Sequence, residues 1–262
     1  MLLRFIASTT LFISTLASAG TTYYVATDGD DVSGDGSSAN PWATITHAVD
    51  HAQDGATVIV RPGTYNGRAN LRQVFATGLT VRSETPYAAK LRHDSGAAVI
   101  CYYGRNITLE GFDIAHAPGN TGGLVIQVQD LLGDFNGSNG GTDPVVSGIV
   151  FRNNIIHDST NNDLLKINNG AENVLVEGNM FFNQFGSDEH MDVNSVIGVV
   201  IQDNVFFNTV DNNTSSFIVV KDSGDSDDGL EGAEDVTIRR NVFLNWDGGI
   251  EQFVKIGNDG RP

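Results

Sequence analysis

The chain repeats one short segment five times, and this repetition constrains its fold more than any other feature. Each copy is a run in which apolar residues alternate with other residues. The copies are Asn106–His116, Gly148–Asp158, Asn173–Asn183, Gly198–Asn208 and Asp235–Asn245. Three equivalent asparagines, Asn154, Asn179 and Asn204, recur every 25 residues. A constant period of this length is typical of stacked coils rather than of an ordinary globular domain.

The alternation within each copy has period two, as the letters NVLVEGNMFFN at Asn173–Asn183 illustrate. It predicts a strand, a tight turn and a second strand. Parallel neighbours need a crossover, and crossovers are right-handed, so the sequence predicts an all-β, right-handed parallel β-helix. The turn asparagines would then stack about 4.8 Å apart and exchange side-chain amide hydrogen bonds. We assign this Asn ladder a structural role.

The first 19 residues have the features of a secretory signal peptide. Arg4 precedes an apolar stretch, and Ala17-Ser18-Ala19 provides a small-residue cleavage site. We therefore predict a signal peptide over residues 1–19 and a secreted product, extracellular or periplasmic, that starts at Gly20. No later segment of the sequence is apolar for long enough to span a bilayer.

Residues 20–262 are predicted to form a single parallel β-helix domain. Cys101 is the only cysteine, so no intrachain disulfide forms and we expect a buried thiol. Stability must then come from the stacked core. The last segment, GIEQFVKIGNDGRP, has the pattern of a strand that enters a further turn without a cap. We therefore expect the domain to be truncated at its C-terminal end.

The formal net charge of −17 limits the partners of this chain. An acidic surface repels nucleic acid and anionic membranes, and we predict neither as a partner. It also opposes unaided binding of a polyanionic sugar, an objection that a bridging metal ion would remove. The alternative is that the acidic surface keeps a secreted protein soluble. We expect a monomer.

The region before the first repeat predicts a cap for the solenoid. Within Ala43–Gln53, apolar residues from Ile45 to Ala52 follow helical spacing, which predicts an N-terminal helix over the open end of the first coil. The stretch Ala39–Tyr65, ANPWATITHAVDHAQDGATVIVRPGTY, resembles the opening of secreted β-helix proteins of the pectate lyase superfamily. This resemblance implies the fold more strongly than it implies an activity.

Two insertions interrupt the coils, Asp130–Pro144 and Asp222–Asp235. In solenoids, long insertions leave from one face and commonly border a binding groove. The second insertion combines clustered acids with glycines. It suits either a further calcium ion or, in the simpler interpretation, a solvated loop.

Three strand-like segments between Asp163 and Asp222 carry the candidate chemistry. Alternation places Lys166, Asp192 and Lys221 outward and their apolar neighbours inward. If these segments occupy successive coils, the three side chains form one column with neighbours about 4.8 Å apart. Such a column is either part of a catalytic site or a charge ladder that offsets repulsion between coils.

Four acidic residues accompany this column: Asp163, Asp188, Glu189 and Asp192. Asp163 precedes Asp188 by 25 residues, which predicts neighbouring coils and convergence of the four carboxylates. Converging carboxylates without a cation raise one another's pKa, whereas this many oxygen ligands suit Ca²⁺, which we predict as the cofactor. The segment offers no Cys or paired-His set for zinc. His190, within the same cluster, is either a substrate-binding residue or an ordinary hydrogen-bonding surface residue.

This constellation resembles the calcium-dependent pectate lyases of polysaccharide lyase family nine. Their pattern is an Asp on one coil, Asp-Asp-x-x-Asp on the next and a lysine base on the following coil. Asp163 corresponds to the first position, residues 188–192 (DEHMD) to the second, and Lys221 to the third. The sequence departs from the pattern at Glu189, which replaces an Asp. Lys166 is an additional cation, so the identity of the base stays open between the two lysines.

The resemblance implies β-elimination on an acidic polysaccharide that contains uronic acid. Calcium would bind the substrate carboxylate, and Lys221 would remove the proton at C5. Arg239 and Arg240, in the last repeat, alternate in direction. Either one of them holds a second substrate carboxylate, or both belong to a solvated strand face.

Two other functions use the same residues. A β-helix glycoside hydrolase would use the carboxylates as general acid and base and would need neither calcium nor lysine. A non-catalytic carbohydrate-binding or cell-surface β-helix protein would use the acids only for structural calcium. Calcium dependence separates the lyase from the hydrolase. Loss of activity with retained sugar binding in a Lys221→Ala protein separates the lyase from the binding protein.

Overall fold

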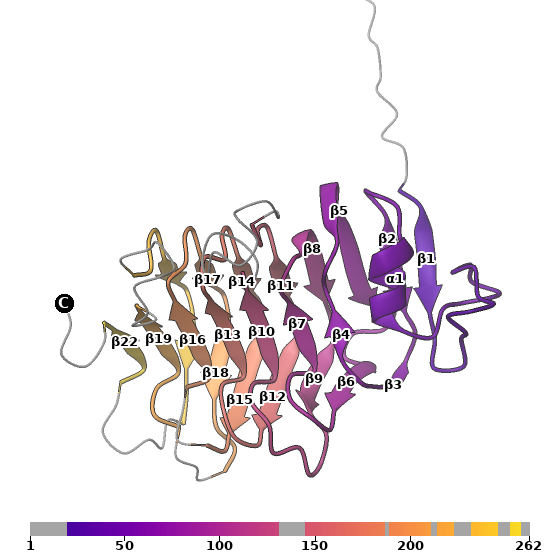
Figure 1. Ribbon diagram of the computed structural model, residues 1–262. Helices are drawn as coiled ribbons and strands as arrows, with labels where there is room; N and C mark the ends of the chain where they lie inside the picture. The colour runs from indigo at the N-terminus through magenta and orange to yellow at the C-terminus, as the bar shows by residue number, and fades with distance from the viewer. Residues whose placement is uncertain are drawn as a thin grey trace, which may run out of the picture.

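A computed structural model describes residues 20–130, 145–186, 189–210, 214–222, 232–245 and 252–257 of the chain. The predicted signal peptide lies outside these residues. The regular structure described consists of parallel β-strands and one short helix. The strands form three sheets, A, B and C, and within each sheet they stack along one common axis (Figure 1).

Sheet A has eight strands, in spatial order β1 (Thr22–Val25), β2 (Thr57–Val60), β5 (Val74–Ser83), β8 (Arg105–Glu110), β11 (Val150–Arg152), β14 (Leu175–Glu177), β17 (Val200–Gln202) and β20 (Thr237–Arg239). Sheet B has seven, β3 (Gly63–Asn66), β6 (Ala89–His93), β9 (Asp113–His116), β12 (Ile155–Ser159), β15 (Met180–Gln184), β18 (Val205–Phe207) and β21 (Val242–Phe243). Sheet C also has seven, β4 (Ala69–Asn70), β7 (Val99–Cys101), β10 (Ile126–Gln129), β13 (Leu165–Asn168), β16 (Met191–Asn194), β19 (Ile218–Lys221) and β22 (Val254–Ile256).

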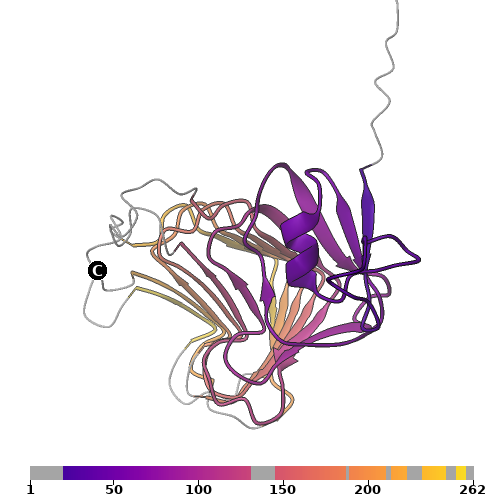
Figure 2. The same ribbon diagram turned by 45° about the vertical axis from the view of Figure 1, so that its right-hand side comes forward.

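From β2 onward the chain visits sheets A, B and C in turn, so that each coil adds one strand to each sheet. For example, β11, β12 and β13 pair in parallel with β14, β15 and β16 of the next coil. The strands surround one interior, as the rotated view shows (Figure 2). The molecule is therefore a right-handed parallel β-helix, which confirms the predicted fold class.

The corner between sheets A and B carries the predicted Asn ladder. Asn154 Nδ2 donates to Asn179 Oδ1 at 3.1 Å, and Asn179 Nδ2 donates to Asn204 Oδ1 at 3.0 Å. The three side chains are buried, so these amide hydrogen bonds satisfy polar groups that water cannot reach. The residue before each ladder position turns the corner with positive φ: 54° at Asn153 and 68° at Gly178. A Cβ at Gly178 would lie only 2.5 Å from Asn153 Oδ1, which explains the glycine there.

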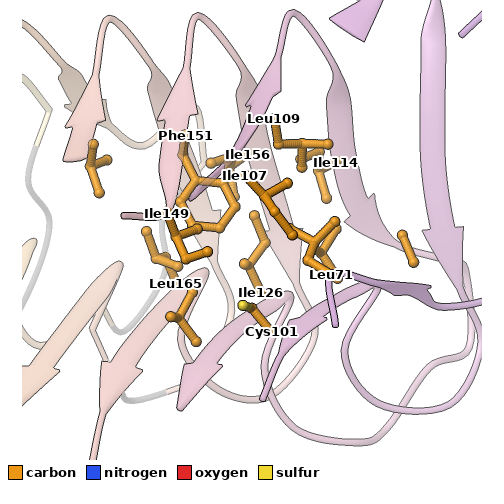
Figure 3. Close-up of a cluster of buried hydrophobic side chains, with 14 of the residues drawn as sticks. Leu71, Cys101, Ile107, Leu109, Ile114, Ile126, Ile149, Phe151, Ile156 and Leu165 are labelled. Atoms are coloured by element: carbon orange, nitrogen blue, oxygen red, sulfur yellow. The ribbon is translucent and has the colours of Figure 1, made fainter. Parts of the chain in front are cut away.

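The interior is a continuous apolar core of inward-facing strand residues. Leu71, Cys101 and Ile126 point into it from consecutive coils (Figure 3). Phe181 and Phe206 stack with ring centroids 4.9 Å apart. Cys101 is a free thiol with no exposed surface, and burial raises its pKa to about 12. The thiol is therefore a core group, as expected from the sequence.

Helix α1 (Ile45–His51) lies at the N-terminal end of the solenoid (Figure 2). The Thr44 hydroxyl caps it by accepting a hydrogen bond from the His47 amide at 3.1 Å. Ile45, Ala48 and Val49 are buried, and the helix contacts β1 and β4, which fits the predicted capping role. The helix is shorter than the predicted Ala43–Gln53. Among the described residues, no helix is long and apolar enough to cross a membrane.

The two predicted insertions leave the solenoid at equivalent points. The first follows β10 at Asp130, and the second follows β19 at Asp222, so both begin where a strand of sheet C ends. Most of each insertion, residues 131–144 and 223–231, lies outside the described residues. The alternative interpretations of the acidic second insertion stay predictions.

Candidate functional site

The outward face of sheet C brings Lys166 and Asp192 together, as predicted. The two residues are paired in register on β13 and β16. Lys166 Nζ donates to Asp192 Oδ2 at 2.7 Å. Their strand neighbours Leu165 and Ile167 are fully buried on the opposite side of the sheet, so the alternation places charged groups outward and apolar groups in the core.

Lys221 joins this cluster from a different position than predicted. Its register partner on β16 is Asn194, whereas Asp192 pairs with Val219. The prediction that the three residues form a single column is therefore wrong. The displacement is two residues, which keeps Lys221 on the same face of the sheet. Its Nζ lies 3.3 Å from Asp192 Oδ2. The Lys–Asp–Lys contact is therefore present, with Lys221 reaching back along the sheet.

Asp192 is the centre of the cluster and lies deeper than its partners. Its side chain is 2% exposed, against 25% for Lys166 and 27% for Lys221. Asn194 Nδ2 also donates to Oδ2, at 3.1 Å. Within the described residues, the second carboxylate oxygen, Oδ1, is buried and has no hydrogen-bond partner. The two lysines compensate the charge of this buried carboxylate, because burying a carboxylate without a counter-charge is costly.

Asp163 and Glu189 lie just before β13 and β16, at the entrance of these strands. Asp163 is fully buried and Glu189 is 9% exposed. The offset between these strands is 26 residues, as for Lys166 and Asp192, so the neighbour of Asp163 in the next coil is Glu189 rather than Asp188. Ser215 Oγ donates to Glu189 Oε1 at 3.4 Å. Asp188 lies outside the described residues.

The described carboxylates fit calcium only in part. The unpartnered, buried Oδ1 of Asp192 is an atom that a cation would compensate. Within the described part of the chain, however, no three side chains of the types His, Cys, Asp and Glu lie close enough together to hold a metal ion. The described members of the predicted ligand set, Asp163, Glu189 and Asp192, therefore do not converge as predicted, and Asp188 lies outside the described residues.

His190 points into the core, and the structure does not support the predicted substrate contact. The side chain has no exposed surface. The ring packs edge-on against Phe217, with centroids 4.7 Å apart, and Nε2 lies 3.1 Å from Asn208 Oδ1. Burial lowers the pKa of His190 to about 3. A neutral histidine surrounded by aromatic rings serves packing, since it can neither reach a polysaccharide nor carry charge there.

The two arginines lie away from the cluster, Arg239 on sheet A and Arg240 in the corner that follows it. Arg239 ends β20, and its Nε donates to Gln202 Oε1 at 2.8 Å. Arg240 makes two hydrogen bonds to Asp203, of 2.7 and 2.6 Å. Because the cluster lies on sheet C, neither arginine shares its face. These contacts favour the alternative interpretation, a solvated strand face.

One residue of the cluster escaped the sequence interpretation. Asn194 contacts the Asp192 carboxylate and pairs with Lys221 across the strands. The signal was present in the letters MDVN, because strict alternation places Asp192 and Asn194 on the same outward face. A neutral amide adds nothing to a charge pattern, so a search for charged residues does not find it.

Comparisons with known proteins concern the fold alone. A family model described as a protein of unknown function, DUF1565, matches residues 27–75, a region that does not include the cluster on sheet C. No curated protein matches the sequence. Among solved structures, the GH136 lacto-N-biosidase from Eubacterium ramulus is 11% identical with a TM-score of 0.53, over 89% of this chain and 57% of that chain.

Two lyase structures are also similar. The alginate lyase from Paenibacillus sp. str. FPU-7 is 18% identical with a TM-score of 0.49, over 76% of this chain and 72% of that chain. The pectate lyase Pel9A is 15% identical with a TM-score of 0.38, over 89% of this chain and 79% of that chain. At such low identities a likeness concerns the fold, and the reaction must be argued from the side chains.

Proposed function

We propose that this protein is a secreted, calcium-dependent polysaccharide lyase that cleaves a uronic-acid polysaccharide by β-elimination. The observation that carries the proposal is the cluster on sheet C, where two lysine ammonium groups contact one buried carboxylate. The lysines are partly exposed while Asp192 is not, so a ligand on this face meets the lysines first. Cationic groups on a chain of net charge −17 suit an acidic sugar chain.

In the proposed reaction Lys221 is the base. As a neutral amine it takes the proton from C5 of a uronate unit, the electron pair of that bond forms the C4–C5 double bond, and the C4–O bond breaks. The leaving oxygen takes a proton from water, and the hydroxide that remains takes the C5 proton from Lys221, which restores the neutral amine. To act in this way Lys221 must give up its contact with Asp192, and Lys166, 2.7 Å from the same carboxylate oxygen, remains to compensate Asp192.

The proposed metal site uses Asp192 together with Asp163, Glu189 and Asp188. When bound, calcium would withdraw charge from the substrate carboxylate and so make the neighbouring C5 proton more acidic. The residues of the chain would orient the sugar: the Asp192 carboxylate holds Lys166 throughout and Lys221 before the reaction, and Asn194 fixes the orientation of that carboxylate. Positioning of this kind favours the transition state.

Burial of the acids argues against glycoside hydrolysis. A hydrolase must present two carboxyl groups to the sugar on either side of the scissile bond. Counted over the whole residue, the described candidates Asp163, Glu189 and Asp192 are 0%, 9% and 1% exposed. A non-catalytic binding protein remains the alternative that experiment must separate from the lyase.

The test is the ultraviolet absorbance of unsaturated product, measured on polygalacturonate, alginate and other uronans with added calcium and with chelator. We expect a calcium-dependent rise on one polymer. A Lys221→Ala variant should lose at least about 100-fold in rate, the size expected for a missing general base. Lys90→Ala is a matched control, because Lys90 is an exposed lysine on β6 of sheet B.

The outcomes distinguish the candidates. If Lys166→Ala abolishes turnover while Lys221→Ala retains it, the base is Lys166. If no polymer yields unsaturated product while the folded protein binds uronan, elimination on these polymers is contradicted and the binding protein takes its place. Product formation that persists in chelator would contradict the calcium requirement.

A further inference from the structure

A second group of polar side chains lies on the same face of sheet C, toward the N-terminal end. The Tyr102 hydroxyl donates to Gln127 Oε1 at 2.7 Å. Gln127 Nε2 in turn donates to Gln129 Oε1 at 2.7 Å. Gln127 is paired in register with Lys166 on the next strand of the sheet. A hydrogen-bonded row of neutral groups therefore ends beside the charged cluster.

The row begins at a cavity of about 190 Å³. It is lined by Asn70, Arg72, Ile100, Tyr102 and Tyr103. Register connects this cavity to the cluster, because Asn70, Ile100 and Gln127 follow one another on β4, β7 and β10, and Lys166 continues the same row on β13. The cavity and the cluster therefore lie in one row of residues that runs parallel to the solenoid axis.

The lining has the chemistry of a sugar-binding subsite. Tyrosine rings supply an apolar surface with a polar edge, and the asparagine amide supplies both donors and acceptors. Arg72 Nε donates to Asp50 Oδ1 of helix α1 at 2.9 Å, which fixes the guanidinium at the rim while its side chain stays 49% exposed. The volume is below the range of pockets that enclose drug-sized ligands, so it suits a single sugar ring.

The separation from the cluster requires a chain-like ligand. Neighbouring strands lie about 4.8 Å apart, so β13 is about 10 Å from β7 and β19 is about 19 Å from it. A free monosaccharide cannot reach from Tyr103 to Lys221. A linear polysaccharide that runs along the axis can occupy both places at once.

We propose that the cavity beside Tyr102 and Tyr103 is a remote subsite that binds one sugar unit of the polysaccharide whose reacting unit lies at Lys221. The nature of the ligand rests on the proposed function. The subsite adds affinity for long chains without taking part in the chemistry. It therefore makes the protein select polymers over short oligosaccharides.

The experiment measures binding rather than turnover. In a Lys221→Ala background, titration calorimetry is used to compare oligogalacturonates and oligoalginates from the dimer to chains of eight or more units. We expect Tyr103→Ala to weaken binding of the long chains about tenfold, since one buried aromatic contact is lost, and to leave the dimer unaffected. Tyr102→Phe, which removes only the hydrogen bond to Gln127, should have a smaller effect in the same direction.

Tyr24→Ala is the matched control. Tyr24 is a half-buried tyrosine on β1 of sheet A that also lies beside an arginine, with Arg61 5.5 Å from its ring centre, but it is not on sheet C. Equal weakening by Tyr24→Ala and Tyr103→Ala would overturn the subsite, as would equal weakening of the dimer and the long chains. Unchanged affinity in a folded Tyr103→Ala protein would do the same.

The two proposals fail in different ways. If long chains bind in a Tyr103-dependent manner but the unsubstituted protein forms no unsaturated product, the subsite stands and the lyase does not. If product forms and Tyr103→Ala has no length-dependent effect, the lyase stands and the subsite does not. If neither oligosaccharide series binds, the subsite is contradicted for both sugar classes.

Discussion

Asp113 on sheet B and Asp192 on sheet C are each contacted by two basic side chains from neighbouring coils, but the two clusters differ in exposure. At Asp113, Arg92 Nη2 and His157 Nε2 lie 2.5 and 2.9 Å from Oδ1. All three side chains are similarly half-buried, between 14% and 16% exposed. His157 also stacks on Phe182, with ring centroids 4.8 Å apart. The Asp113 cluster is therefore a set of largely buried contacts that links three neighbouring coils.

The Asp192 cluster has the opposite arrangement. The carboxylate is buried, while Lys166 and Lys221 are each about a quarter exposed and one carboxylate oxygen has no hydrogen-bond partner among the described residues. A purely structural pair would gain more if both oxygens were satisfied. Two basic groups around one acidic group therefore do not by themselves identify a functional site. Uneven burial, with a buried carboxylate oxygen that has no hydrogen-bond partner among the described residues, sets Asp192 apart.

The largest expected difference between the clusters is in activity. Asp192→Asn keeps the shape of the side chain but removes the charge that positions both lysines, so we expect at least about a 100-fold loss in the rate of unsaturated-product formation. Asp113→Asn, the same substitution on the other sheet, should change that rate by less than about twofold. Circular dichroism of both variants checks that they fold. Equal losses in the two folded variants would refute the assignment of the site to sheet C.

The next difference concerns stability when both basic partners are removed. Lys166→Ala or Lys221→Ala alone should lower the free energy of unfolding by about 1 kcal/mol, because the other lysine still compensates Asp192. The double variant leaves a buried carboxylate without a cation, so we expect a loss of about 3 kcal/mol or more, beyond the sum of the single effects. Urea unfolding of the four proteins measures this coupling.

The corresponding cycle on sheet B is the control. Arg92→Ala and His157→Ala should show weaker coupling than the two lysines, because the more exposed Asp113 can be solvated once its partners are gone. Strong coupling at Asp113 with none at Asp192 would reverse the interpretation of the two clusters.

The fold could be predicted from the sequence because two independent features of the repeat indicate it. Period-two alternation defines the strands, and Asn154, Asn179 and Asn204 fix the coil length. The pair Lys166 and Asp192 followed from the same regularity, since β13 and β16 are separated by one uninterrupted coil. Resemblance over Ala39–Tyr65 pointed to the same architecture, although the helix there is shorter than its apolar pattern.

The remaining errors arise where the coil length changes or the backbone leaves the strand. Between β16 and β19 the offset is 27 residues, as for Ser195 and Asp222, so alternation alone could not fix the register of Lys221. His190 precedes β16, where strand alternation no longer decides which way a side chain points. The arginines belong to a repeat whose strands form sheets A and B, which a search along the sequence does not separate from sheet C.

The smallest expected difference is in the pH dependence of stability, and it belongs to the sheet B cluster. Burial lowers the pKa of His157, but hydrogen bonds to Asp113 and Asp158 outweigh it and raise the pKa above its ordinary value of 6.5. Since the folded form holds the proton more tightly, the stabilisation is complete below pH 6.5 and is lost as the pH rises through the raised pKa.

We therefore expect the urea midpoint to fall in a step above pH 6.5, and the step to be absent in His157→Gln. Asp113→Asn should reduce the step, because one of the two hydrogen bonds to the charged ring is lost. His51→Gln, at an exposed histidine of α1, should retain it. A step that persists in His157→Gln would show that His157 is not its source. The stabilising contribution of the Asp113 cluster would then come from Arg92 and Asp113 alone. The two clusters would resemble each other more than their burial indicates.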